Sequence, residues 1–354
     1  MSLRRLQVTD FRCLQAVALD LDARFTLISG ANASGKTSLL EAVYVLGRGR
    51  SFRTRRLEHL IRAQEARFVV FGEVDVSDRL IPMGVEGTRT GIGAKIAGTR
   101  TTSMGELALL LPVQIIGPEV HHLIEEGPSQ RRRFMDWGVF HVEHSFIGHW
   151  QRYQQALRQR NAALKSKQPR TVVAAWDSDL VRYGDLVSSA RERYIEALMP
   201  EAAKIGRHLL SMELSVSYRR GWSRDQSLSE ALLHSWSHDE DTGATQVGPH
   251  RAELSLRLDG LAVKDRISRG QQKLLASALL LAQVKFFPLS APVQPSLLLD
   301  DPAAELDAEH LAGLIEEVSG HAVQLIVTTL HSEFPAFGAP GRRYRVEDGE
   351  VRAV

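Results

Sequence analysis

The sequence predicts an α/β fold that is split by a mainly helical insert. A glycine-rich loop from Gly30 to Thr37 stands between an apolar strand pattern and a helical pattern. Strand and helix patterns alternate near both ends of the chain, whereas residues 118–240 form a series of long polar and amphipathic helical patterns. We therefore expect one sheet that is assembled from both ends of the chain.

Composition limits the class of protein. The 354 residues suffice for two or three domains, and 44% hydrophobic with 24% charged residues is the balance of a globular protein with a core. No stretch approaches the roughly 20 apolar residues of a membrane span, and the N-terminus lacks the apolar segment of a secretion signal. The single cysteine, Cys13, cannot form an internal disulfide, so we expect a small buried residue in a cytoplasmic protein.

Residues 1–117 are expected to form the first half of the sheet. Alternating patterns predict strands over residues 3–8 and 16–21, and the apolar run 25–29 predicts a strand that leads into the glycine loop. Residues 37–46 have helical spacing and stop at Gly47. Further strands are expected over 67–76 and 113–117.

Residues 118–240 are expected to be an inserted helical subdomain, with helices over 129–165, 172–198 and 227–236. Residues 241–354 are expected to resume the sheet. Their patterns predict strands over 252–258, 296–301 and 323–329, and helices over 270–287 and after Asp307.

The glycine loop matches G-x-x-x-x-G-K-S/T in the strand–loop–helix context that this motif requires. Glycines let the backbone approach phosphates, so that successive N–H groups and the helix N-terminus face the negative charge. Lys36 is expected to contact the β- and γ-phosphates, and Thr37 to bind Mg²⁺. The predicted phosphate-binding residues are Gly30, Ala31, Asn32, Ala33, Ser34, Gly35, Lys36 and Thr37.

A nucleotide site of this kind needs a second anchor for the metal, on an apolar strand that ends in a carboxylate. S-L-L-L-D-D supplies it: Asp300 is expected to bind Mg²⁺, and Asp301 to polarise the attacking water. Taken alone, the pattern equally suits a capped strand. Because Lys36 and Asp300 lie 264 positions apart, the helical segment is expected to divide a single nucleotide-binding sheet.

A polar turn comprising Ser268, Arg269, Gly270 and Gln271 opens a long helix before the acidic strand. The free N–H groups and positive end of that helix suit a γ-phosphate, although a simple N-cap also explains Ser268.

Basic residues are clustered although the formal net charge is only +2. Such runs could bind the phosphates of DNA, although helix surfaces also carry them. The runs are Arg48, Arg50, Arg53, Arg55 and Arg56, then Arg131, Arg132 and Arg133, then Arg219, Arg220 and Arg224. Two histidine pairs, His121 with His122 and His141 with His144, are interpreted as solvated helix faces because no third cluster of metal ligands is evident.

Together the glycine loop, S-R-G-Q-Q, L-L-L-D-D and the A-E-L-D that follows resemble the Walker A, signature, Walker B and D-loop segments of ABC-type ATPases. Finer matches resemble the SMC-like RecF family over almost the whole chain. They are L-x-x-L-x-V-x-D-F-R, L-G-R-G-R-S-F-R, G-P-E-V-H-H-L-I-E-E-G-P-S-Q-R-R-R-F-M-D and V-G-P-H-R. Departures from the family pattern are Asp10, Ala33, the pair Ala252 and Glu253, and Asp301, which stands where most ABC ATPases have glutamate.

The resemblance implies an ABC-type ATPase head that binds ATP and Mg²⁺ and dimerises on ATP, each site joining Walker A of one copy to the signature of the other. It implies binding to single- and double-stranded DNA at gaps, and loading of RecA together with RecR and RecO. Hydrolysis is expected to be slow because the Asp301 side chain is short. Either Thr329 or His331 is expected to sense the γ-phosphate.

Two other functions fit parts of the sequence. The nucleotide-binding subunit of an ABC transporter would share the nucleotide motifs, but the insert and the RecF-like motifs weigh against it. A structural SMC arm needs sustained heptads of great length, and the insert is too short for them.

Overall fold

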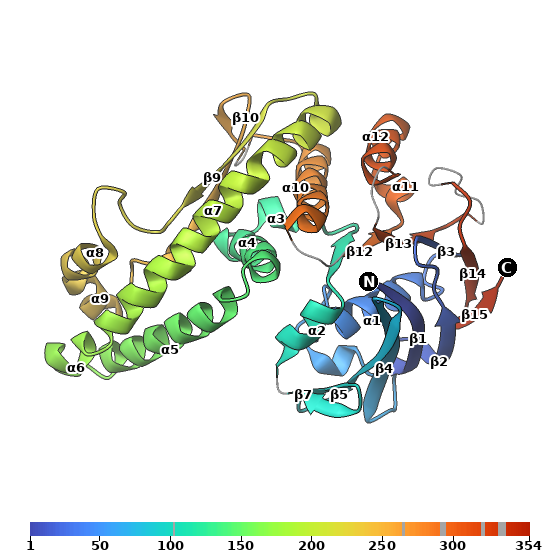
Figure 1. Cartoon of the computed structure of the whole chain (residues 1–354), viewed down its shortest axis with the longest axis horizontal. Helices are drawn as coiled ribbons and strands as arrows, with labels where there is room; N and C mark the ends of the chain where they lie inside the picture. The colour runs from blue at the N-terminus through green and yellow to red at the C-terminus, as the bar shows by residue number, and fades with distance from the viewer. Residues whose placement is uncertain (102, 264–265, 291–294, 320–322, 332–337) are drawn as a thin grey trace. The chain divides into compact units, whose positions relative to one another are not determined.

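The computed structural model describes residues 1–101, 103–263, 266–290, 295–319, 323–331 and 338–354. Contacts divide them into two compact units, residues 1–120 with 284–354, and residues 121–283. Both termini lie on the first unit (Figure 1). The sequence predicts different boundaries, at residues 117/118 and 240/241, because it groups residues 241–283 with the sheet on the basis of their nucleotide motif. The two units are defined by packing alone, so the predicted boundaries remain a prediction.

The first unit contains a six-stranded sheet that combines strands from both ends of the chain. Its order is β15 (Glu350–Ala353), β14 (Arg342–Glu347), β3 (Phe25–Gly30), β13 (Gln324–Thr329), β12 (Ser296–Asp300) and β8 (Val113–Ile116). All neighbours are parallel except β14 and β15. Every residue of β3, β12 and β13 is buried, which explains their continuous apolar runs, because helices or sheets cover both faces of a parallel sheet.

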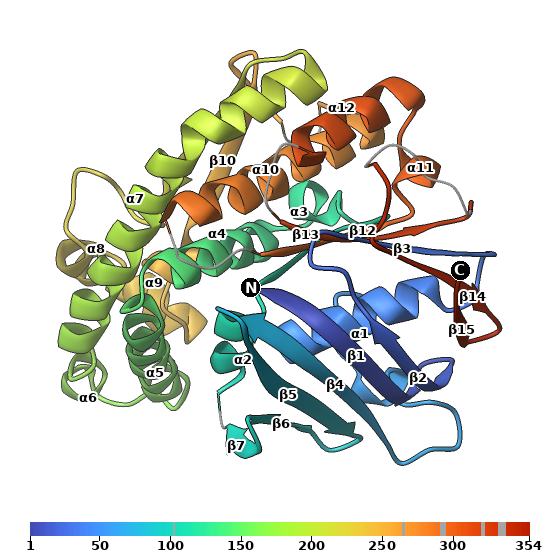
Figure 2. The ribbon, with the colours of Figure 1, turned by 45° about the vertical axis from the view of Figure 1, so that its right-hand side comes forward.

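A second, antiparallel sheet belongs to the same unit. Its order is β2 (Leu14–Asp20), β1 (Ser2–Phe11), β4 (Arg67–Val76), β5 (Arg79–Thr88), β6 (Ile92–Ile96) and β7 (Thr99–Thr101). Helix α1 (Lys36–Arg48) contacts strands of both sheets and lies between them (Figure 2). Leu39 and Leu46 of α1 share one core with Leu6, Phe68 and Ile326. The helix that follows the glycine loop is thus fixed on two sides.

Short elements complete the first unit: η1 (Leu57–His59), α2 (Met104–Leu110), α11 (Pro302–Glu305) and α12 (Ala308–Ser319). The helix predicted after Asp307 corresponds to α12.

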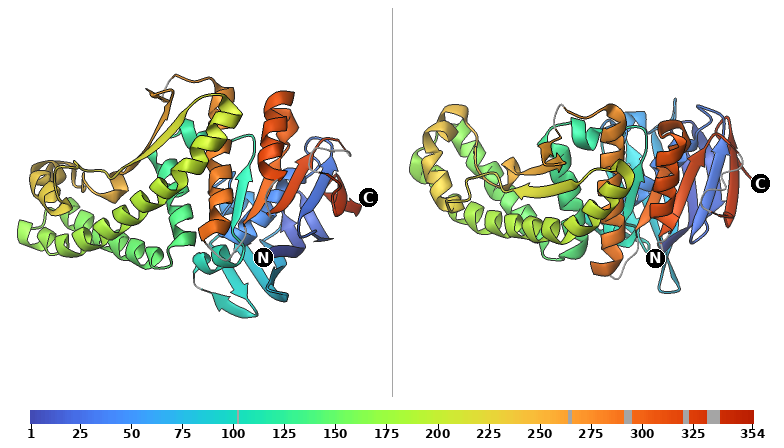
Figure 3. Two further views of the ribbon diagram at one scale, coloured as in Figure 1. Left: turned by 45° about the horizontal axis from the view of Figure 1, so that its top comes forward. Right: turned by 90° about the horizontal axis from the view of Figure 1, so that it is seen from above.

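The second unit is mainly helical. It contains α3 (His122–Glu125), α4 (Pro128–Val142), α5 (Phe146–Lys165), α6 (Arg170–Ala174), α7 (Asp177–Leu210), α8 (Leu228–His234), α9 (Trp236–Thr242) and η2 (Pro249–Arg251), and α10 (Arg269–Ser290) begins in it. Helices α5 and α7 pack against each other (Figure 3). The single helix predicted over 129–165 is instead two, because the backbone of Glu143 leaves the helical region (φ −127°, ψ 100°). No glycine or proline marks that break.

Three short strands form a separate antiparallel sheet in this unit, in the order β11 (Leu261–Ala262), β10 (Glu253–Leu258) and β9 (Leu214–Arg219). The strand predicted over 252–258 therefore forms, but it pairs with β9 and does not extend the six-stranded sheet. Its residues alternate between buried and partly exposed, as expected for an antiparallel strand with one covered face.

The V-G-P-H-R segment is held by buried polar contacts of the second unit. His250 Nδ1 accepts a hydrogen bond from the Tyr153 hydroxyl (2.6 Å), so His250 Nε2–H donates to the Thr245 carbonyl (2.9 Å). Burial lowers the pKa of His250 to about 4, and the ring is neutral at physiological pH. Arg191 pairs with Asp136 and donates to the Pro249 carbonyl. These contacts give the segment a structural role.

Candidate nucleotide site

A cavity of about 400 Å³ lies where β3 and β12 end. Carboxyl ends of parallel strands are where α/β sheets bind their ligands. The cavity is lined by the glycine loop (Asn32, Ala33, Gly35, Lys36, Thr37), by Asp300 and Asp301, and also by Cys13 and Arg53. The structure thus brings the two predicted nucleotide elements of the first unit together.

The backbone of the glycine loop is shaped as a cradle. At Gly30 any Cβ would lie 2.3 Å from the Val346 carbonyl oxygen, so only glycine fits. Ala33 adopts a left-handed φ of 62°, which costs a non-glycine residue about 1 kcal/mol. Among the described residues, the N–H groups of positions 32, 33 and 35–38 have no acceptor. Unsatisfied N–H groups at a helix N-terminus are a binding site for a phosphate anion.

Lys36 is positioned at this cradle by the loop itself. Its Nζ donates to the carbonyls of Gly30 (2.7 Å) and Ala31 (2.8 Å). Burial lowers the pKa of Lys36, and the charges of Asp301 and Asp300 oppose that shift. The ammonium group is therefore held beside the free N–H groups, where a phosphate oxygen can replace the two carbonyls as its acceptor.

Thr37 and Asp300 face each other across the cavity. The Thr37 hydroxyl lies 2.9 Å from Asp300 Oδ2, to which it donates, and only 5% of Asp300 is exposed. A hydroxyl and a carboxylate supply the hard oxygen ligands that Mg²⁺ prefers in a phosphate site. The two residues therefore fit the ion that the motifs imply.

Asp301 also lines the cavity, with a left-handed φ of 47°. Burial raises the pKa of Asp301; Lys36 and His331 lower it, and Asp300 adds to the rise. A carboxylate with a raised pKa accepts a proton more readily near neutral pH. The position and environment of Asp301 suit a general base.

Thr328 is a residue of this site that sequence reasoning missed. Its buried hydroxyl donates to Asp300 Oδ1 (2.7 Å) and accepts from the Asp301 N–H (3.0 Å), so one side chain positions both acids. The sequence did contain a signal for Thr328: a threonine near the end of the apolar run 323–329, which forms β13 beside β12. Its neighbour Thr329 is also fully buried, and its hydroxyl accepts from the His331 N–H (3.3 Å).

Cys13 contradicts its predicted burial. It is exposed, and its Sγ lies 3.7 Å from the Ser38 hydroxyl at the wall of the cavity. Cys13 sits in the tight turn between β1 and β2, where Arg12 has a φ of 57°. The turn directs Arg12 inward to pair with the fully buried Glu41 (2.7 Å), and leaves Cys13 outside.

The arginine run 48–56 divides into different roles. Arg48 donates to the Val113 carbonyl (2.9 Å), and burial lowers its pKa to about 10, so its role is structural. Arg53 instead lines the cavity and lies 3.7 Å from Glu41. Phe52 packs on Tyr44 at the edge of the core.

Most members of the other two runs contact their own unit. Arg131 pairs with Glu253 (2.7 Å), and Arg132 donates to the Ala252 carbonyl (2.8 Å). Arg220 donates to the carbonyls of Ser223 and Gln226. Arg50, Arg55, Arg56 and Arg219, in contrast, are exposed, and their side chains have no hydrogen bond or ion pair among the described residues.

The predicted signature residues belong to the second unit. Ser268 caps α10: its hydroxyl accepts from the Gln271 N–H (3.2 Å), while its own N–H donates to Gln271 Oε1 (3.0 Å). Ser268, Arg269 and Gly270 are exposed. The cap explains the turn, and exposure leaves it available to another molecule.

The two histidine pairs are not both solvated faces. His121 and His141 are buried, with exposed fractions of 2% and 4%. Ligand atoms of His121, His122 and Glu125 lie within 4.8 Å of one another. However, His121 Nε2 already contacts the Arg269 guanidinium (3.1 Å), whose charge opposes a metal cation there.

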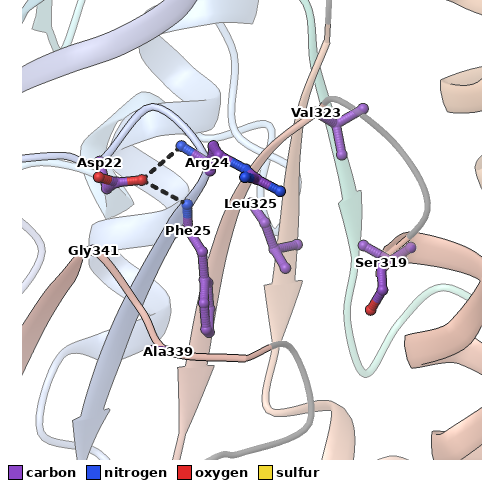
Figure 4. A pocket seen from close by; sticks show the side chains of 9 residues that line it. Asp22, Arg24, Phe25, Ser319, Val323, Leu325, Ala339 and Gly341 are labelled. Atoms are coloured by element: carbon purple, nitrogen blue, oxygen red, sulfur yellow. Dashed lines mark hydrogen bonds between the residues drawn. The ribbon is translucent and has the colours of Figure 1, made fainter.

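A second cavity of the first unit, about 300 Å³ in volume, lies at the opposite, amino-terminal ends of β3 and β13 (Figure 4). The Asp22 carboxylate at its margin accepts from the N–H groups of Arg24 (2.7 Å) and Phe25 (3.0 Å). Asp22 thus stabilises the turn into β3.

Comparisons with known proteins agree with this geometry. The family described as RecF/RecN/SMC N terminal domain matches residues 2–340. The chain is 40% identical to the DNA replication and repair protein RecF of Thioalkalivibrio sulfidiphilus (strain HL-EbGR7), over 99% of both chains. It is 39% identical to the protein of the same name from Yersinia pestis bv. Antiqua (strain Angola), over 99% of this chain and 98% of that one.

Solved structures agree as well. The structure of the recombination mediator protein RecF with ATP, in the RecFOR pathway, has a TM-score of 0.88, 27% identity, and coverage of 100% of this chain and 97% of that one. The Smc head domain of Pyrococcus furiosus has a TM-score of 0.60 at 18% identity over 100% and 96% of the chains, a likeness of fold alone. The fold is that of an ABC-type ATPase head. Among the described helices, none is long and apolar enough to cross a membrane.

Proposed function

Because this chain belongs to the RecF family of the RecF/RecN/SMC group, we propose that it is an ATP-dependent DNA-binding protein of recombinational repair and replication maintenance. The observation that supports this most directly is the cavity of the first unit, where free loop N–H groups, Lys36, and the pair Thr37 and Asp300 converge.

In this proposal the triphosphate of ATP occupies the glycine-loop cradle. The free N–H groups of residues 32, 33 and 35–38 bind phosphate oxygens, and Lys36 binds the β- and γ-phosphates. Thr37 and Asp300 would hold Mg²⁺, which supplies charge neutralisation of the phosphates. Asp301 accepts the proton of the attacking water, and His331 stands near enough to influence the Asp301 pKa.

The second half of each site would come from another copy of the chain. One chain carries one Walker A loop and one signature turn, so two complete sites of the family type require a homodimer. Ser268, Arg269 and Gly270 are exposed at the N-terminus of α10, as a surface that meets a γ-phosphate must be.

The proposed role of ATP is that of a switch. The bound nucleotide holds two copies around single- or double-stranded DNA at a gap or junction, and slow hydrolysis releases them. Slow hydrolysis is expected because Asp301 reaches less far than the glutamate usual in ABC ATPases. The partners in this proposal are RecR, RecO and RecA, and the setting is the nucleoid in the cytoplasm.

ATP-driven dimerisation is tested with Ser268→Arg. Sedimentation velocity should detect a dimer of the unchanged protein with ATP, favoured further by gapped DNA, and a monomer without nucleotide. Ser268→Arg should stay monomeric with ATP, because the long cationic side chain occupies the surface intended for the other copy.

The matched control is Ser268→Ala, which removes the same cap at a cost of about 1 kcal/mol without adding bulk. It should still dimerise on ATP. A Ser268→Arg protein that dimerises as well as the unchanged chain would contradict the shared site.

Removing the Thr328 hydroxyl should slow hydrolysis. In Thr328→Val, Asp300 and the Asp301 N–H each lose a buried partner, and a hydrogen bond to a charged group contributes about 1.5–3 kcal/mol. We expect kcat for ATP hydrolysis to fall roughly 10- to 100-fold while KM changes little.

Thr328→Ser keeps the hydroxyl and should retain most of the activity. Thr26→Val, at an equally buried threonine of β3 whose hydroxyl accepts from the Asp22 N–H and contacts neither acid, is the control for packing. Equal losses of kcat in Thr328→Val and Thr26→Val would show that Thr328 has no special positioning role.

A further inference from the structure

Helix α5 carries two exposed arginines that have no ion pair among the described residues. The 20 residues of α5 include three arginines and one lysine and no acidic residue. Arg160 is buried in ion pairs, but Arg152 and Arg158 are exposed, and neither has a carboxylate within ion-pair distance among the described residues. Helix α5 therefore carries free positive charge although it has no arginine run. Other exposed cations of the second unit are Lys204, Arg207 and Arg219.

The exposed side chains between positions 151 and 159 of α5 form one polar face. Recurrence at three- and four-residue spacing brings them to the same side of a helix, while α7 covers the other side. We define the α5 face as Gln151, Arg152, Gln155, Arg158 and Gln159 of α5 together with Arg182 of α7. None of its members is apolar or acidic.

The ring of Tyr183 contacts two of these arginines. The Arg152 guanidinium donates to the Tyr183 hydroxyl (2.8 Å) and lies 5.4 Å from the ring centre, and the Arg182 guanidinium lies 5.5 Å from the same ring. Tyr183 itself is 7% exposed. Both cations are ordered by one aromatic ring and have no counter-ion among the described residues, so less entropy is lost when they bind an anion.

Acidic residues define the limits of this face. Asp179 and Asp185 stand on α7 one turn before and after Arg182, and neither is within ion-pair distance of it. At the other end of α5, Lys165 packs beside Gly243, just after the exposed Glu240 and Asp241 of α9. We therefore leave Lys165 out of the face.

We propose that the α5 face binds the sugar–phosphate backbone of DNA. Arginine guanidinium and glutamine amide groups are donors suited to phosphate oxygens, and Arg152 to Arg158 span about 9 Å along the helix, enough for successive phosphates. Protein partners use apolar anchors at the centre of an interface, whereas DNA interfaces are polar and positively charged. The face consists of arginines and glutamines, and exposed apolar side chains stand at its margins, at Ile147 one turn before the face on α5 and at Leu186 one turn after Arg182. This composition favours DNA over an acidic protein. This inference rests on the proposed function and assigns a surface to it.

The test is the salt dependence of DNA binding by the full-length chain in ATP and Mg²⁺. A triple variant, Arg152→Gln with Arg158→Gln and Arg182→Gln, should bind a fluorescent duplex at least tenfold more weakly than the unchanged protein. The slope of log affinity against log salt should shrink by up to about 0.9 for each phosphate contact removed. The corresponding triple lysine variant keeps the charges and should keep most of the slope.

Two controls separate the surface from general effects. Arg158 is exposed and has no partner in the part of the chain that the structure describes, so Arg158→Gln alone should reduce the slope without changing the melting temperature. A charge-matched triple, Arg79→Gln, Arg89→Gln and Arg100→Gln, removes three exposed arginines of the first unit and should leave binding within about threefold. Equal losses in the two triple variants would overturn the assignment, because only net charge would matter.

Two further outcomes distinguish a failure of the α5 face assignment from a failure of the proposed function. If the unchanged protein binds ATP but no DNA, the proposed function fails together with the surface. If it binds DNA and the α5 triple binds equally well with the same salt slope, only the surface is wrong. Unlabelled poly-glutamate and unlabelled DNA of equal total charge can be compared as competitors of the fluorescent duplex. If poly-glutamate displaces the duplex as strongly as DNA does, DNA is not the specific ligand of the α5 face.

Discussion

Lys36→Met should nearly abolish ATP binding and leave the fold intact. In the structure Lys36 Nζ satisfies the carbonyls of Gly30 and Ala31, beside loop N–H groups that lack acceptors. When ATP binds, phosphate oxygens would replace the two carbonyls as acceptors of the Lys36 ammonium group. Each hydrogen bond to a charged group contributes about 1.5–3 kcal/mol. Because 1.4 kcal/mol is tenfold in affinity, losing two such bonds predicts at least a hundredfold weaker binding. Titration with a fluorescent ATP analogue at fixed Mg²⁺ measures it.

Burial lowers the Lys36 pKa, which means that the charged form of Lys36 is less favourable in the folded chain than in water. Its replacement by methionine should therefore not lower the melting temperature. Lys36→Arg retains the charge in a longer, planar group and should bind ATP but hydrolyse it poorly. Lys95→Met, at an exposed position of β6, is the neutral control. Affinity of Lys36→Met within threefold of the unchanged chain would contradict the role of Lys36.

The first-unit site could be anticipated from sequence because each of its elements is local. The glycine loop needs only a strand, a turn and a helix in succession, and β12 is a buried parallel strand whose apolar run ends at Asp300. The sequence also predicted that the glycine loop and Asp300 lie together although 264 positions separate Lys36 from Asp300. The reason is that the strands of one parallel sheet end at the same edge.

Residues that act through tertiary contacts could not be anticipated in this way. Thr328 is one of two adjacent threonines, and only the pairing of β12 with β13 shows that its hydroxyl reaches both acids. Cys13 is exposed because the turn after β1 directs Arg12 inward to Glu41.

The helical insert shows a related difficulty. Periodicity continues through residues 143–145, so the break between α4 and α5 carried no signal. The strand over 252–258 was recognised, but its sheet was not, although its alternating burial is typical of an antiparallel partner. Charge density along a chain likewise does not reveal which cations have partners: Arg131 pairs with Glu253, whereas Arg50 is exposed and has no partner among the described residues.

The largest loss of stability is expected from Arg160→Met, at the centre of the second unit. Arg160 is fully buried and pairs with Asp177 (2.7 Å) and Asp239 (2.7 Å), and it also donates to Thr245 Oγ1 (2.9 Å). Methionine fills similar volume but leaves the fully buried Asp239 carboxylate without its counter-ion. Breaking a buried pair on one side costs about 3–5 kcal/mol of unfolding free energy.

Tryptophan fluorescence during urea denaturation reports this unit specifically, because all five tryptophans lie within residues 121–283. Arg158→Met, two positions away on the exposed face of α5, should change the unfolding free energy by no more than about 0.5 kcal/mol. Combining Arg160→Met with Asp239→Leu removes both buried charges, so the double variant should be more stable than Arg160→Met alone. If it is instead less stable by the sum of the single losses, the two side chains act independently, and an uncompensated charge is not the source of the cost.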